Sequence, residues 1–170
     1  MIKVIASKRK SNPLMRQMES LSKIRTALMN DSTAKEICTD NEIEPKFLEI
    51  VPIRYEKLEV TAKTVNGSII LNPKLMKKSF KIIMRYVIHE LVHAIQHTKD
   101  YGQKETDKKK DYLNREDEIE AFQYQVKYDE KHRGPKKTEE YVDGLLDFHD
   151  LSEDNKEDKK KEIMEKAEAN

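Results

Sequence analysis

The longest amphipathic segment of this chain runs from about Lys74 to Thr98, and it constrains the fold more than any other feature. Apolar residues recur there at steps of three and four, which is the pattern of a helix with one wide buried face. The residues of this face are Met76, Phe80, Ile83, Met84, Val87, Ile88, Leu91, Val92 and Ile95. We therefore predict a central helix over residues 74–98.

Two further helices and a final short one follow from the same period. Residues 13–29 carry one apolar stripe made of Leu14, Met18, Leu21, Ile24 and Leu28, so this helix is expected to lie on the core. Residues 115–131 form a second helix that ends near Gly134-Pro135. Thr138 is expected to cap the last short helix.

Between Phe47 and Leu71 the apolar period shortens to two, which predicts strands. The alternating residues are Leu48, Ile50, Ile53, Tyr55, Leu58, Val60, Ala62 and Val65. Asn66-Gly67 predicts a two-residue hairpin turn, because both central positions of a type I′ turn have positive φ. Residues 69–71 are then a short buried strand.

A length of 170 residues suits one domain, which we place at residues 1–150. Its predicted fold class is α+β, with a helical part at 1–46, a small twisted antiparallel or mixed sheet at 47–72, and the helices 74–98 and 115–131. Residues 99–111 lack apolar periodicity and are expected to be an exposed loop. Residues 151–170 are mostly Glu, Asp and Lys, which predicts a disordered tail or a frayed helix.

Charge and cysteine content exclude several classes of protein. The 33 basic and 32 acidic residues leave a net charge of +1, so the whole-surface basic footprint of a dedicated nucleic-acid binder is missing. Cys38 is the only cysteine, which rules out an intrachain disulfide and a cysteine-based zinc knuckle. No apolar run approaches the roughly 18–20 residues of a membrane span, and no apolar stretch follows the first basic residues. We expect a cytoplasmic protein with no membrane partner.

The sequence His89-Glu90-Leu91-Val92-His93 lies inside the predicted central helix. A four-residue step places both imidazoles on one face, one turn apart, where they are able to bind one metal ion. Glu90 lies about 100° round the helix from His89, where it is able to take a proton from water without binding the metal. The alternative is a pair of core histidines that are satisfied by hydrogen bonds.

A catalytic zinc ion usually has three protein ligands, so a third ligand is needed. His97 is unsuitable, because its α-carbon lies about 12 Å along the helix axis from that of His89. On the helix 115–131, Glu118 borders the apolar face of Phe122 and Val126, whereas Glu116 and Glu120 lie roughly 160° and 200° away from Glu118. Glu118 is therefore the predicted third ligand. The remaining alternatives are Glu120, then Glu116, Asp117 or no further protein ligand.

An HExxH helix followed by a helix with Glu118-x-x-Ala121 resembles the gluzincin clan of zinc metallopeptidases, and its small ImmA/IrrE-like and minigluzincin-like members above all. The resemblance covers residues from about 48 to 130. It implies a zincin-like fold, with an edge strand near Ile69, and one zinc ion per chain, bound by His89, His93 and Glu118. It further implies hydrolysis of a peptide bond in an intracellular protein or peptide by a zinc-activated water, with Glu90 as the general base.

Two other HExxH families fit less well, and the resemblance leaves two roles unassigned. Metzincins require Gly and His where this chain has Gln96 and Lys99, and peptide deformylases need a Gly-Cys ligand that Cys38 does not match. Phe122 stands where Asn or Asp often follows the alanine, so the partner that orients a histidine is unassigned. The donor that stabilises the oxyanion is also open, and its candidates are Tyr124, Tyr128, His132, Tyr141 and His149.

Two other functions remain as alternatives to a peptidase. One is a catalytically idle zinc-stabilised module that touches DNA through basic residues in 1–25 and through Lys74, Lys77, Lys78, Lys81 and Arg85. The other is an autoinhibited enzyme in which residues 132–170 cover the cleft. The sequence does not predict the oligomeric state.

Overall fold

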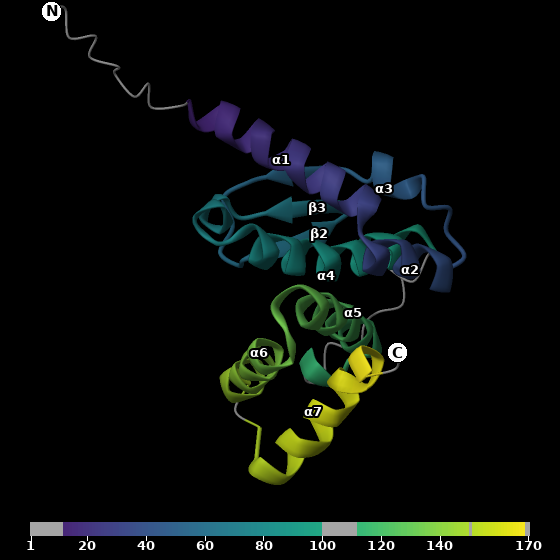
Figure 1. Ribbon diagram of the computed structural model, residues 1–170, viewed down its shortest axis with the longest axis vertical. Coiled ribbons are helices and arrows are strands. Elements are labelled where there is room, and N and C mark those ends of the chain that lie inside the picture. Colours follow the sequence, from purple (N-terminus) through teal and green to yellow (C-terminus); the bar gives the residue numbers. More distant parts are fainter. Residues whose placement is uncertain (1–11, 100–111, 150, 169–170) are drawn as a thin grey trace, which may run out of the picture.

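The computed structural model describes residues 12–99, 112–149 and 151–168 (Figure 1). The fold is α+β and mostly helical, with one small mixed sheet. The loop predicted at 99–111 falls almost entirely outside the described residues, as do the basic side chains of residues 1–11. Among the described residues, no helix combines the length and the apolar character that a membrane crossing requires.

The sheet has three strands, β1 (Ile53–Tyr55), β2 (Ala62–Val65) and β3 (Ser68–Leu71), in the spatial order β1-β3-β2. β1 runs parallel to β3, and β2 runs antiparallel to it. The predicted hairpin is confirmed, since Asn66 and Gly67 join β2 to β3 with φ angles of 49° and 72°. A Cβ on Gly67 would lie 3.2 Å from the ring of His97, so this turn also packs closely on the following helix.

The prediction that the strand near Ile69 lies at an edge is wrong. β3 is the central strand, and Ile69, Ile70 and Leu71 are buried there. β2 forms one edge of the sheet instead, and its side chains alternate between half-buried and exposed. The physical reason is that the continuous apolar run of β3 needs cover on both faces, whereas β2 needs cover on one.

The central helix is α4 (Phe80–Thr98), and it begins later than predicted. The Asn72 side chain instead accepts a hydrogen bond from the backbone N–H of Lys74 and starts a separate 3₁₀ turn, η1 (Pro73–Lys77). Ser79 then marks the start of α4. Most residues of α4 between Ile83 and Ile95 are buried, as its wide apolar face predicts, whereas His97 and Thr98 at its end are exposed.

The N-terminal part contains α1 (Pro13–Asn30), α2 (Ser32–Asp40) and α3 (Phe47–Ile50). Ile24 and Leu28 of α1 are fully buried, but Leu14 and Met18 of the same predicted stripe are exposed, because the first half of α1 extends beyond the sheet (Figure 1). The strands predicted at 47–50 and 58–60 are wrong, because 47–50 is a helical turn and 58–60 is irregular. Leu48 and Val51, three residues apart, are the buried pair of this turn.

The C-terminal helices are α5 (Glu116–Arg133), α6 (Pro135–Phe148) and α7 (Glu153–Glu168), and a short 3₁₀ turn, η3 (Tyr112–Asn114), precedes α5. In Figure 1, α5 lies between α4 on one side and the pair α6 and α7 on the other. Thr138 is not a cap, since it lies inside α6, where its hydroxyl bonds to the backbone oxygen of Gly134 and to Asp129.

Of the two states predicted for residues 151–170, a disordered tail and a frayed helix, the structure has a helix, α7, over residues 153–168. Ile163 and Met164 are buried and share a second hydrophobic cluster with Phe122 and Val126 of α5. Gln123 also donates a hydrogen bond to the backbone oxygen of Glu162. Two buried apolar residues in a segment of high helix propensity are therefore enough to pack this charged helix against α5.

A buried charge network ties α4, α5 and α6 together. Asp129 of α5 is fully buried and contacts Arg85 of α4 at 3.5 Å and Arg133 at 3.0 Å. Thr138 of α6 lies 3.3 Å from the same carboxylate, and the Arg85 guanidinium stacks on the Tyr141 ring at 3.6 Å from its centroid. Arg85 is therefore a structural residue and is not available to the basic surface predicted for the DNA-binding alternative.

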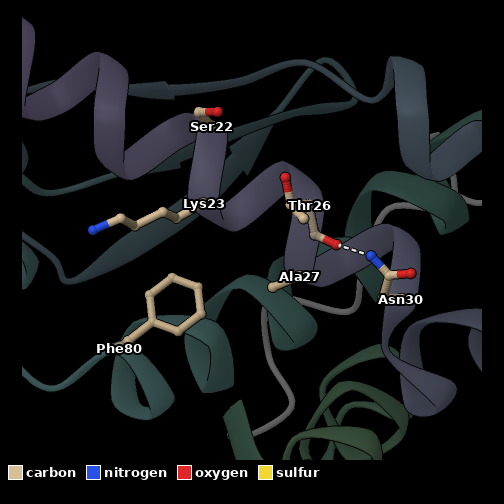
Figure 2. A pocket seen from close by; sticks show the side chains of 6 residues that line it. All are labelled: Ser22, Lys23, Thr26, Ala27, Asn30 and Phe80. Carbon is tan, nitrogen blue, oxygen red and sulfur yellow. Dashed lines mark hydrogen bonds between the residues drawn. The ribbon is translucent and has the colours of Figure 1, made fainter.

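An open hollow lies between α1 and the start of α4 (Figure 2). Its lining is mostly uncharged, with Lys23 as the one charged side chain among the lining residues Ser22, Lys23, Thr26, Ala27, Asn30 and Phe80. Phe80 precedes His89 by nine residues, which corresponds to roughly 13 Å along the helix axis. The hollow is therefore separate from the histidine pair.

Candidate functional site

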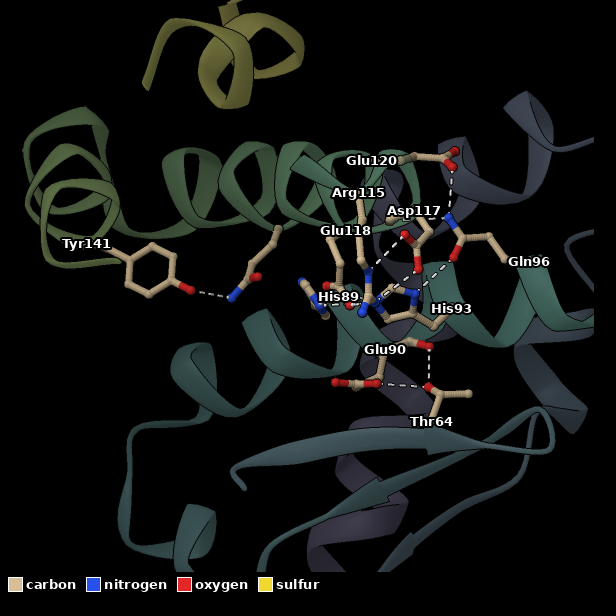
Figure 3. Close-up of polar contacts among 11 residues, drawn as sticks. Thr64, His89, Glu90, His93, Gln96, Arg115, Asp117, Glu118, Glu120 and Tyr141 are labelled. Carbon is tan, nitrogen blue, oxygen red and sulfur yellow. Dashed lines mark hydrogen bonds and ion pairs between the residues drawn. The ribbon is translucent and has the colours of Figure 1, made fainter. Parts of the chain in front are cut away.

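The structure brings His89, His93 and Glu118 together at the contact between α4 and α5 (Figure 3). Glu118 Oε2 lies 3.3 Å from His89 Nε2 and 3.4 Å from His93 Nε2. The two Nε2 atoms lie 3.2 Å apart. His89 and Glu118 are buried, and the His93 side chain is 17% exposed, so the three donor atoms converge where α4 and α5 meet.

The spacing of these donors fits a tetrahedral metal ion. Bonds of about 2.0–2.1 Å to nitrogen or oxygen at tetrahedral angles place the donor atoms roughly 3.3–3.4 Å apart. The three observed separations, 3.2, 3.3 and 3.4 Å, match the edges of such a site. Glu118 Oε2 is also a buried atom without a hydrogen-bond partner. Two neutral imidazoles and one carboxylate are a ligand set that zinc accepts, so these residues fit the predicted metal.

The electrostatics of the cluster also favour a cation. Burial opposes protonation of His93, but the close contact with Glu118 and the negative charge of that carboxylate outweigh it and raise the His93 pKa to about 9. For Glu118, burial is likewise outweighed by its contacts with His89 and His93, which hold its pKa well below the usual range. The carboxylate is therefore ionised at neutral pH and attracts positive charge to the point that it shares with the two Nε2 atoms.

Gln96 holds His93 in the orientation that a metal ligand needs. Its Oε1 lies 2.9 Å from His93 Nδ1, while its Nε2 donates to Glu120 Oε2 at 3.0 Å and to the backbone oxygen of Asp117 at 3.3 Å. Because two acceptors fix the amide nitrogen, the amide oxygen faces the imidazole and accepts its Nδ1 proton. In the neutral form of His93 that binds a metal, the lone pair of Nε2 is then directed at the cluster.

Glu90 lies on the side of α4 that faces the sheet, and β2 holds it there. The Thr64 hydroxyl lies 2.9 Å from Glu90 Oε2 and 2.9 Å from the Glu90 backbone oxygen. Glu90 is 6% exposed, and its charge is close enough to contribute to the raised pKa of His93. In Figure 3 the Glu90 side chain lies between the histidines and β2. The sequence predicted its angle on the helix but not this contact with Thr64.

Tyr112 is a residue near the site that the sequence analysis missed. Burial and the charge of Glu118 raise its pKa, and Glu90 contributes in the same direction. Its ring packs edge-on against Phe122, which in turn packs edge-on against His89. It lies in η3, a short 3₁₀ turn with no apolar period, so no sequence pattern predicts its place near the site.

The five residues proposed as oxyanion donors lie elsewhere, apart from His149. Tyr124 donates to Asp40, His132 contacts Asp31 at 2.9 Å, and Tyr128 packs on His132. Tyr141 accepts a hydrogen bond from Gln125 and lies away from the histidines in Figure 3. His149 stacks on Tyr112, with the ring centroids 5.6 Å apart, so it borders the site through that side chain.

The alternative third ligands do not face the cluster. Glu116 is exposed, Asp117 pairs with Arg115, and Glu120 accepts from Gln96. His97 is exposed and lies against the hairpin turn at Gly67. Among the described residues, Glu118 is therefore the carboxylate that completes a set of three with His89 and His93.

None of the protein-family models matches this chain, and no curated protein or solved structure is detectably similar to it. The arrangement of the site therefore has to carry the functional argument.

Proposed function

We propose that this protein is a zinc-dependent metallopeptidase that hydrolyses peptide bonds of a protein or peptide substrate. The observation that carries the proposal is the triangle of His89 Nε2, His93 Nε2 and Glu118 Oε2, whose 3.2–3.4 Å sides match a tetrahedral zinc site. Glu90, which is buried beside the histidines and is not part of the triangle, supplies the group that distinguishes a catalytic site from a structural one.

His89, His93 and Glu118 would hold the metal. When bound, zinc lowers the pKa of water and polarises a carbonyl oxygen. Glu90 accepts the proton of the attacking water and passes it to the leaving amine, and Thr64 orients the Glu90 carboxylate for both transfers. Tyr112, whose raised pKa keeps the phenol protonated at neutral pH and whose ring borders the cluster through Phe122, is our candidate donor for the developing oxyanion.

The order and placement of the elements support the resemblance to gluzincins. The HExxH helix α4 packs on the sheet, β2 forms the edge beside Glu90, and the next long helix, α5, supplies Glu118. An edge strand has unpaired backbone groups on one side, which suits an extended peptide. We assign the zincin-like arrangement on this basis.

The first test is the metal content of the purified protein, measured by mass spectrometry beside Glu118→Ala and Glu120→Ala. We expect one zinc ion per chain in the wild type and in Glu120→Ala, since Glu120 contacts Gln96 rather than the histidines. Glu118→Ala should lose the metal. If the wild type neither contains zinc nor takes it up, His89 and His93 are structural core residues and the peptidase proposal is refuted.

The second test concerns catalysis, with a random-sequence peptide library as the substrate. Glu90→Gln should keep zinc and abolish cleavage, because the amide is unable to accept the proton of water. The matched control is Glu157→Gln, the same substitution at an exposed position of α7, which should cleave as the wild type does. Cleavage that survives in Glu90→Gln would refute the assigned mechanism, and zinc without any cleavage would favour the idle binding module.

A further inference from the structure

Arg115 lies at the junction of η3 and α5, directly beside the proposed zinc ligand. Its Nη2 is 2.6 Å from Glu118 Oε1. The same nitrogen lies 3.2 Å from Asp117 Oδ2, and its Nε lies 3.4 Å from Asp117 Oδ1. Arg115 precedes the first residue of α5, yet it makes no side-chain cap to the helix. Its guanidinium is thus committed to two adjacent carboxylates instead of to the backbone.

These contacts give the two carboxylate oxygens of Glu118 different neighbours. Oε1 faces Arg115, and Oε2 faces His89 and His93 and has no hydrogen-bond partner. A free carboxylate beside a cation is able to offer both oxygens or to rotate between them. With Oε1 held by a charge-assisted bond, only Oε2 remains free for the point that the two imidazoles share.

We propose that Arg115 is a positioning residue that restricts Glu118 to one metal-binding oxygen. The inference rests on the proposed zinc site and goes beyond it, since it assigns a role to a side chain that touches neither metal nor substrate. A single oxygen leaves room for a water molecule and a substrate carbonyl next to the ligands, which a catalytic site needs and a closed structural site does not.

Asp117 contacts the same guanidinium as Glu118. Its carboxylate is held in a two-point contact with Arg115, and the N-terminus of α5 favours both acidic residues. A lysine would supply the charge but not the planar fork that reaches Asp117 and Glu118 together.

The alternative role for Arg115 is structural, as an ion pair that fastens the first turn of α5. The two roles differ in what they affect. If Arg115 is only a structural ion pair, it stabilises the metal-free protein and affects zinc affinity only through folding. A positioning residue changes zinc affinity and coordination while the metal-free protein stays folded. Asp117→Asn serves as the matched control, because it weakens the Arg115–Asp117 pair and leaves Glu118 with its partner.

The experiment measures zinc affinity by competition with a chelator, and the melting temperature of the metal-free protein, for wild type, Arg115→Ala, Arg115→Lys and Asp117→Asn. We expect Arg115→Ala to weaken zinc binding about 10- to 100-fold, as loss of an outer partner of a ligand usually does. Arg115→Lys should fall between Arg115→Ala and wild type, and Asp117→Asn should stay closest to wild type. Metal-free Arg115→Ala should stay folded but melt at a lower temperature than the wild type, because the buried Glu118 loses its partner.

Cobalt(II) alone provides a second readout, since its visible absorption is intense at four-coordinate sites and weak at higher coordination. The wild type should show the intense bands, and Arg115→Ala should lose intensity as Glu118 offers both oxygens. If Arg115→Ala fails to fold, Arg115→Lys carries the same comparison. Unchanged affinity and spectrum in these variants, or an equal loss in Asp117→Asn, would overturn the role of Arg115. A wild type that binds neither ion would instead refute the proposed function itself.

Discussion

Replacing Gln96 by leucine should weaken metal binding without touching any proposed ligand. The substitution removes the amide that accepts from His93 Nδ1 at 2.9 Å, and it also breaks the contact of Gln96 with Glu120. Leucine is of similar size and has no polar atom, so the His93 ring loses the partner that fixes its tautomer. His93 is then free to carry its proton on Nε2, the atom that faces Glu118.

The expected loss follows from the contact that is removed. A typical buried hydrogen bond contributes about 0.5–1.5 kcal/mol net, which bounds the change in stability of the metal-free protein. Removing the outer partner of a ligating histidine usually costs about 10- to 100-fold in metal affinity, or roughly 1.4–2.7 kcal/mol. The effect on zinc binding should thus exceed the effect on folding.

The assay is competition between the protein and a zinc chelator, run beside urea unfolding of the metal-free protein. Glu120→Gln is the control, because its amide oxygen is still able to accept from Gln96 Nε2, and its zinc affinity should stay within about threefold of wild type. If Gln96→Leu also bound zinc within about threefold of wild type, His93 would not depend on Gln96, and the tautomer argument would be refuted.

Three further predictions concern pH and stability. Glu118 raises the pKa of metal-free His93 to about 9, so below that pH zinc must displace a proton to bind. Chelator competition should therefore show zinc affinity rising roughly tenfold per pH unit up to about pH 9. A zinc affinity that does not change with pH would contradict this prediction. Asp129→Ala leaves Arg85 buried without a counter-charge and should cost about 3–5 kcal/mol in urea unfolding, whereas a loss under about 1 kcal/mol would mean that the network is not needed. Ile163→Ala should cost roughly 2–5 kcal/mol if α7 is docked as described, against almost nothing for alanine at the exposed Glu157.

Helical periodicity was enough to predict the candidate ligands. The angle between two side chains on one helix depends only on their spacing, so His89 and His93 were expected on one face and Glu118 beside the apolar face of its helix. In the structure Glu118 is 4% exposed and faces both histidines, whereas Glu116 is exposed. That these residues bind zinc stays a prediction.

Helical periodicity does not predict contacts between different secondary-structure elements. Thr64 reaches Glu90 across 26 residues of sequence, and Tyr112 enters the site from a short turn. Neither placement follows from a period. Gln96 did carry a signal, since a residue three positions after His93 lies next to it on the same helix, and its amide suits an imidazole.

The order of the strands also had a signal in the sequence. Residues 68–71 read Ser-Ile-Ile-Leu, a nearly continuous apolar run of the kind found in strands buried on both faces, and residues 62–65 alternate as strands with one solvated face do. The incorrect edge strand came from the family resemblance, which this pattern should have corrected. Similarly, Ile163-Met164 among helix-forming lysines and glutamates favoured a docked helix over a disordered tail.

The buried polar atoms without partners show where this chain departs from the rules that stabilise a fold. Glu118 Oε2 and His89 Nδ1 are two such atoms, and both belong to the histidine cluster. Desolvating a carboxylate and two imidazoles costs free energy that apolar side chains at the same positions would not. The chain nevertheless holds Glu118 with Arg115 and His93 with Gln96, so each donor is aimed by a separate contact. A cation at their common point would satisfy Glu118 Oε2 and both Nε2 atoms together, and donors held in advance at the contact between two helices are what the proposed zinc site requires.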